Sequence, residues 1–159
     1  MRVRYIPRAI QLLKNSFFQI TNLNIRLGYL QPLEMLIFLN GISAMQSLKK
    51  LKLRFELPPS HFSGGDHPFN FNIIFLSKLY NLESIEFESI SKSESYLQMD
   101  LNQYEVLVEE CPKLKCIGFR SDTKLKCFGE IGSEKLGLGD NWKLISTPRR
   151  YLLHKVMSQ

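Results

Sequence analysis

The feature that most constrains the fold is a hexapeptide pattern that occurs four times. In each copy, large apolar residues take the first, fourth and sixth positions, and polar or small residues fill the others. The copies begin at Ile20, Leu48, Leu82 and Leu114, so their starts are 28, 34 and 32 residues apart. Periodicity of this length is typical of stacked repeats, which bury one continuous core together. The chain is therefore expected to fold as a row of similar units.

Each copy of the hexapeptide leads into a predicted strand, because apolar and polar residues alternate there. Strands are predicted near residues 22–27, 50–55, 84–88 and 116–120. A helical pattern precedes each strand, at residues 7–17, 32–46, 69–80 and 100–111. The third of these segments is apolar enough to fit either a helix or a buried strand, and its length favours a helix.

Two regions depart from this pattern. Residues 56–69 contain three prolines and two adjacent glycines, which predict a loop insertion. Residues 121–159 are expected to form an irregular C-terminal cap of the single domain 1–159, because four glycines argue against a long helix between 128 and 140. Within this cap, residues 142–145 are predicted as a short strand and the tail 148–159 as a closing helix.

Composition and cysteine usage bound the protein class. The chain of 159 residues is long enough for one domain with a sizeable core, and 44% of its residues are hydrophobic. Its apolar runs are far too short for a membrane span, and its N-terminus lacks the pattern of a secretory signal. Three cysteines and no Asn-x-Ser/Thr acceptor argue against a disulfide framework. We therefore expect a cytoplasmic or nuclear protein.

The net charge of +6 conceals an uneven distribution along the chain. Residues 1–60 carry nine basic and two acidic residues, residues 61–110 two and nine, and residues 111–159 ten and four. A nucleic-acid-binding domain usually gathers its positive charge on one face, and here an acidic middle interrupts it. The charge pattern therefore ranks a nucleic-acid partner below a protein partner.

The segment Glu110-Cys111-Pro112-Lys113-Leu114 joins a predicted helix to a predicted strand. With the four hexapeptides it resembles the leucine-rich-repeat family, whose strand motif is L-x-x-L-x-L, over roughly residues 5–120. The closest likeness is to the irregular repeats of F-box leucine-rich-repeat proteins. The resemblance implies an α/β fold, a short curved solenoid with a parallel sheet on its concave face and helices on its convex face. The uneven spacing and the insertion at 56–69 depart from the family pattern, and no F-box is visible.

In such a solenoid, the residues that alternate with the buried ones line the concave face. Those with charged side chains are the candidate partner-binding residues: Arg26, Lys52, Arg54, Glu86, Glu88 and Arg120. Asn24 and Gly118 lie on the same face. Arg54, Glu88 and Arg120 can instead form a cross-strand ion ladder of purely structural value, and both interpretations stay open.

No catalytic or metal-binding motif was found. His61, Asp66 and His67 match no common zinc spacing, and Cys111, Cys116 and Cys127 form no Cys-x-x-Cys pair, so they are interpreted as packed thiols. No nucleophile elbow or phosphate-binding loop is present. We expect no enzyme activity, no cofactor and no metal.

Three functions remain open. The resemblance implies a protein–protein interaction scaffold with its partner on the concave face, or the substrate-recognition part of an F-box-type ubiquitin ligase. The alternative is a nucleic-acid-binding domain that uses the basic N-terminal region and the tail Pro148-Arg149-Arg150. The small number of repeats suggests a third interpretation, a truncated chain with no function of its own.

Overall fold

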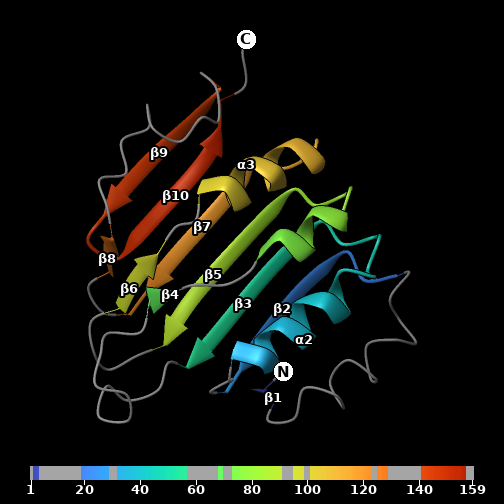
Figure 1. The fold of residues 1–159 in the computed structure, drawn as a ribbon, viewed down its shortest axis with the longest axis horizontal. Helices are drawn as coiled ribbons and strands as arrows, with labels where there is room; N and C mark the ends of the chain where they lie inside the picture. Colours follow the sequence, from blue (N-terminus) through green and yellow to red (C-terminus); the bar gives the residue numbers. More distant parts are fainter. Residues whose placement is uncertain are drawn as a thin grey trace.

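The computed structural model is of class α/β, and its central element is a mixed β-sheet (Figure 1). The structure describes residues 2–3, 19–28, 32–56, 68–69, 73–90, 95–98, 101–122, 125–128 and 141–156. Seven strands form the sheet, in the order β1-β2-β3-β5-β7-β10-β9. The expected α/β class is therefore confirmed.

Five strands of the sheet run parallel to one another. They are β1 (Arg2–Val3), β2 (Asn22–Leu27), β3 (Lys50–Glu56), β5 (Ser84–Ile90) and β7 (Cys116–Ser121). The last four are the strands that the hexapeptides predict, and their boundaries agree to within two residues. Their alternating apolar residues fit a sheet that is covered on one side only.

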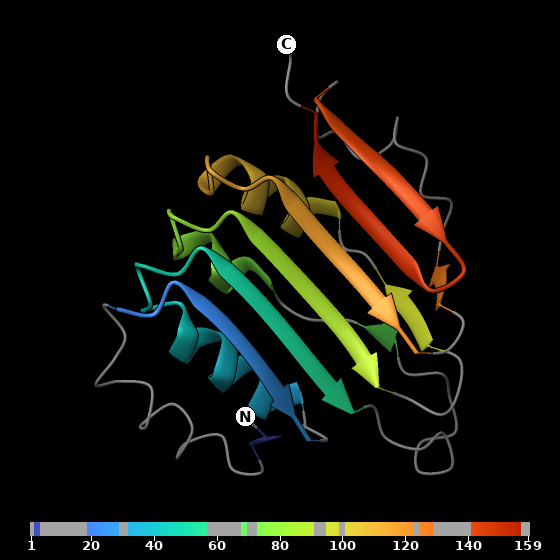
Figure 2. The same ribbon diagram turned by 180° about the vertical axis from the view of Figure 1, so that it is seen from behind.

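The helices of the described part all lie on one face of this sheet, and Figure 2 shows the other face without a helix. They are α2 (Pro32–Ile42), the 3₁₀ helix η2 (Ile73–Lys78) and α3 (Leu101–Glu110). None of them is long and apolar enough to cross a membrane. The helix predicted at residues 7–17 lies outside the described residues.

The helix predicted at residues 69–80 is much shorter than expected and is of the 3₁₀ type. Its buried residues are Ile73 and Leu76, and the buried Leu79 follows directly after it. These residues recur at every third position, which matches the 3.0 residues per turn of a 3₁₀ helix. The side chain of Gln103 on α3 accepts a hydrogen bond from the Ile73 amide at 2.8 Å. Packing against α3 thus fixes the start of η2.

The turns between helix and strand have the same geometry in three successive units. In each, the first residue of the hexapeptide donates its amide hydrogen to the carbonyl three positions earlier at 2.9 Å: Leu48 to Met45, Leu82 to Leu79 and Leu114 to Cys111. All six residues are buried. The repeat inferred from the sequence is therefore a repeat of backbone structure as well.

Register aligns the buried residues of neighbouring strands in rows. Leu51, Ile85 and Ile117 are partners in one row. In the next row, the rings of Phe87 and Phe119 stack with centroids 5.3 Å apart. These rows pack against the helices and form one hydrophobic core.

A second, smaller sheet follows the large one in the chain. It contains β4 (Pro68–Phe69), β6 (Ser95–Gln98) and β8 (Leu125–Phe128), all parallel. These strands come after β3, β5 and β7 respectively, so each of the three units contributes one strand to each sheet. The sequence did not predict this sheet, and the end of the expected 56–69 insertion belongs to it.

The closing helix predicted at 148–159 is wrong. The tail forms β10 (Arg150–Lys155), which makes an antiparallel hairpin with β9 (Trp142–Thr147) and pairs with the edge of β7. Leu153 is buried in register with Ile117, so pairing with the open edge of β7 decides the conformation. The predicted strand at 142–145 is confirmed, and over 141–156 the cap is regular rather than irregular.

Replacing Phe119 by alanine is expected to lower the free energy of unfolding by about 3–5 kcal/mol, because the ring is 2% exposed and contacts both Phe87 and Tyr104. Urea unfolding followed by circular dichroism measures this change. Leu33→Ala is the control: Leu33 is 65% exposed, and its loss is expected to change stability by less than about 0.5 kcal/mol. Equal effects of the two substitutions would contradict the described core.

Candidate functional site

The candidate site is the open face of the sheet, defined as the face opposite α2, η2 and α3. Side chains on this face alternate with the buried residues of each strand. Register arranges them in two rows. The arginine row contains Arg26, Arg54, Glu88, Arg120 and Arg150, and the lysine row contains Asn24, Lys52, Glu86, Gly118 and Leu152.

All six residues predicted to bind a partner therefore lie on one face. Arg150 and Leu152, which extend the two rows onto β10, were missed as members of this face. Arg150 was noticed only as part of a basic tail, because that tail was interpreted as a helix. The edge of β7 could have indicated the position of the tail, because an unpaired sheet edge favours pairing with a further strand.

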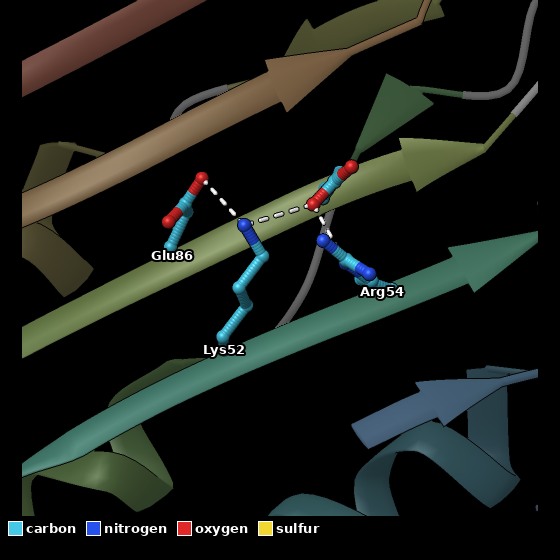
Figure 3. Close-up of polar contacts among 4 residues, drawn as sticks. Lys52, Arg54 and Glu86 are labelled. Atoms are coloured by element: carbon cyan, nitrogen blue, oxygen red, sulfur yellow. Dashed lines mark hydrogen bonds and ion pairs between the residues drawn. The ribbon is translucent and has the colours of Figure 1, made fainter. Parts of the chain in front are cut away.

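Four of the charged residues form one ion network (Figure 3). Lys52 Nζ lies 3.1 Å from Glu86 Oε1 and 3.0 Å from Glu88 Oε2, so it bridges two carboxylates of β5. Arg54 Nε donates a hydrogen bond of 2.9 Å to Glu88 Oε2. Two positive charges on β3 thus balance two negative charges on β5.

Glu88 is the centre of this network. Its side chain is only 11% exposed, whereas that of Arg54 is 42% exposed. Burial alone would raise the pKa of Glu88, but hydrogen bonds and positive charge from Lys52 and Arg54 outweigh it and hold the pKa below the ordinary value. Glu88 is therefore kept ionised and fixed in position.

Two further ion pairs lie at the margins of the sheet. Arg26 Nη2 is 3.1 Å from Glu56 Oε1, and Lys115 Nζ is 3.4 Å from Glu83 Oε2. The basic side chains of the two pairs, Arg26 and Lys115, are 45% and 59% exposed, so each pair contributes little to stability in water. Arg26 is thus engaged with β3 rather than with a residue of its own row.

Arg120 and Arg150 stand apart from the network. They are direct partners in the antiparallel pairing of β7 with β10, and both are exposed. Within the part of the chain that the structure describes, neither forms an ion pair with an acidic residue. The ion ladder inferred from the sequence therefore includes Arg54 and Glu88 but not Arg120.

Cys111 is a buried structural thiol, as the sequence predicted. Its sulfur lies 3.6 to 3.7 Å from the carbonyl oxygens of Leu76, Ser77 and Leu79, in the last turn of η2 and just after it. Burial, with a smaller contribution from Glu110, raises the pKa of Cys111 to about 11. The thiol is thus a weak nucleophile.

Cys116 lies half-buried on the open face, beyond the two rows. Burial raises the pKa of its thiol, the charge of Arg150 offsets part of the rise, and that of Glu86 adds to it. The described side chains contain no group of three His, Cys, Asp or Glu residues that could hold a metal ion. His61, Asp66 and His67 lie outside the described residues, as does the side chain of Cys127.

The described part of the open face therefore offers a set of charged side chains, four of which are held in place by ion pairs. Such a surface can recognise a partner of complementary charge. Comparison with protein-family models, with curated proteins and with solved structures finds no match to this chain.

Glu88→Gln is expected to lower the free energy of unfolding at pH 7 by about 1–3 kcal/mol, because charge-assisted hydrogen bonds from Lys52 and Arg54 are lost. The folded-state pKa of Glu88 is lowered, so its contribution is fully present above the ordinary value of 4.5 and is lost as pH falls through the folded value. The difference between wild type and variant should therefore shrink in acid.

Urea unfolding of both proteins from pH 7 to pH 3 measures this difference. Glu109→Gln, at an exposed position of α3, is the matched control and is expected to have little effect at any of these pH values. A difference that stays constant down to pH 3 would contradict the role of Glu88.

Iodoacetamide at pH 8 is expected to alkylate Cys116 before Cys111, since the reactive species is the thiolate and Cys111 is buried with a pKa of about 11. Peptide mapping by mass spectrometry measures the two rates separately. In concentrated urea both cysteines should react at similar rates. Alkylation of native Cys111 as fast as Cys116 would contradict the burial of the Cys111 thiol.

Proposed function

We propose that this chain is a protein-interaction scaffold that binds its partner on the open face. The single observation that carries the proposal is the alignment of the charged residues predicted from the sequence in two rows on a face free of described helices. The ion network holds Lys52, Arg54, Glu86 and Glu88 in fixed positions, which lowers the entropy lost on binding. Arg54 remains substantially exposed while paired, so a partner can still reach it.

We further propose that the repeated units form a short leucine-rich-repeat solenoid with the open face as its concave side. The identical turns at Leu48, Leu82 and Leu114 support this, as does the in-register parallel pairing of β2, β3, β5 and β7. Asn81 also donates a hydrogen bond of 2.9 Å to the Gln46 carbonyl of the preceding turn, and Lys113 Nζ donates one of 2.6 Å to the side-chain oxygen Oδ1 of Asn81. Contacts between successive units are what hold a solenoid together.

Two more specific functions are candidates. Substrate recognition within an F-box-type ubiquitin ligase is proposed only on the likeness of residues 110–114 and the hexapeptides to that family. Nucleic-acid binding is the second candidate, favoured by the exposed Arg120, Arg149 and Arg150. Binding to generic duplex DNA that weakens steeply with rising salt would support it, because phosphate contacts release counterions.

Exchanging the two charges by Arg54→Glu with Glu88→Arg is expected to abolish partner binding, because the pattern of the open face is reversed while the net charge is unchanged. Quantitative mass spectrometry of affinity-purified wild type and variant measures the loss, after thermal unfolding has shown that both are folded. Lys78→Glu with Glu109→Arg makes the same exchange at exposed helical positions and should lose no partner. An unchanged set of recovered proteins would refute the role of the open face.

A further inference from the structure

Arg120 and Arg150 are an uncompensated pair of like charges. Register places them directly opposite each other on β7 and β10. Like charges in this arrangement repel and destabilise a sheet. Glu88 is the acidic neighbour of Arg120 in the row, but it is bound by Lys52 and Arg54 on its other side. The fold therefore places two arginines at partner positions, and no described acidic residue forms an ion pair with either.

The positive charge of Arg150 influences a neighbouring side chain on the open face. Cys116 lies on β7, four residues before Arg120, and the positive charge of Arg150 offsets part of the rise in its pKa that burial causes. Gly118, two residues before Arg120 on β7, has no side chain, and the side chains of Leu152 and Glu86 lie beside it, whereas Arg120 and Arg150 are both exposed. Asp122, two residues beyond Arg120, forms no ion pair with a described residue. An anionic group can thus approach both arginines.

We infer that Arg120 and Arg150 together bind an acidic side chain of an extended peptide segment in the partner protein. This inference rests on the proposed function and adds the chemistry of the partner. Guanidinium groups bind carboxylates with two parallel hydrogen bonds, and two of them side by side suit a segment rich in Asp and Glu. Within the two rows, the positive charge without a described ion pair lies at this end, since the network at Lys52 and Arg54 is neutral overall and Arg26 is paired with Glu56.

A peptide fits these charges better than a nucleic acid does. A phosphate backbone that crossed the open face would pass the network of Lys52, Arg54, Glu86 and Glu88, which is neutral overall and offers it no net attraction. Nucleic-acid binding without base contacts also needs several phosphate contacts, whereas two adjacent arginines supply few. An acidic peptide needs only one or two favourable residues at this end and tolerates basic or polar residues over β5.

The test measures binding of a fluorescein-labelled peptide of alternating Gly and Glu to the whole chain by fluorescence anisotropy. Arg120→Gln with Arg150→Gln is expected to weaken binding by about tenfold or more, because the charge-assisted hydrogen bonds are lost. The same variant should unfold at an equal or higher temperature than wild type, since a repulsion is removed. Lys78→Gln with Lys155→Gln removes two exposed charges elsewhere and should change affinity by less than about twofold.

Three results would overturn the inference: no peptide binding by wild type, equal weakening by the lysine control, or duplex DNA bound through the two arginines while the peptide is not. If the glutamine variant fails to fold, Arg120→Lys with Arg150→Lys, which keeps the charge but not the two parallel hydrogen bonds, should still weaken binding. The exchange of Arg54 and Glu88 tests the proposed function separately. Partner loss in that variant, with peptide binding unaffected by the arginine variants, would reject only this inference.

Discussion

The register of the parallel strands is the constraint on which the rest of this structure depends. It places Leu51, Ile85 and Ile117 in one buried row and, one residue further along each strand, Lys52, Glu86 and Gly118 in one row on the open face. A slip of one residue in any strand would exchange the two faces and bury charge without partners. The hydrophobic core and the charged surface are therefore two results of the same pairing, and a change in one disturbs the other.

Charge on the open face is organised by strand order rather than by distance along the chain. Lys52 and Arg54 come from the basic N-terminal third, and Glu86 and Glu88 from the acidic middle. Parallel pairing of β3 with β5 brings these opposite charges together, and the low exposure of Glu88 makes its ion pairs worth more than ordinary surface pairs. The hairpin then places Arg150 beside Arg120, and the strand order brings no described acidic residue into an ion pair with either of them. The open face is therefore neutral at the ion network and positive at the hairpin.

Much of the fold could be predicted because each repeat has a recognisable pattern of apolar and polar residues within a short segment. Strict alternation from Leu51 to Phe55 is enough to predict both a strand and the face of each residue. The predictions failed where pairing partners decide the outcome. The tail 150–155 was predicted to be helical, and pairing with the open edge of β7 makes it a strand. The small sheet of β4, β6 and β8 likewise joins short segments from three units. For the site, six residues were found from alternation, whereas Arg150 needed the hairpin.

The sequence by itself determined the repeated unit, the four parallel strands and the side chains that alternate with the core, because each depends on residues close together in the chain. Only the tertiary structure decided which charges meet. Lys52 is 34 residues from Glu86, and Arg120 is 30 residues from its row partner Arg150. Neither pairing has a counterpart in any local pattern, since contacts between strands depend on register and strand order. The ion network around Glu88 and the unmatched pair of Arg120 and Arg150 are consequences of that assembly.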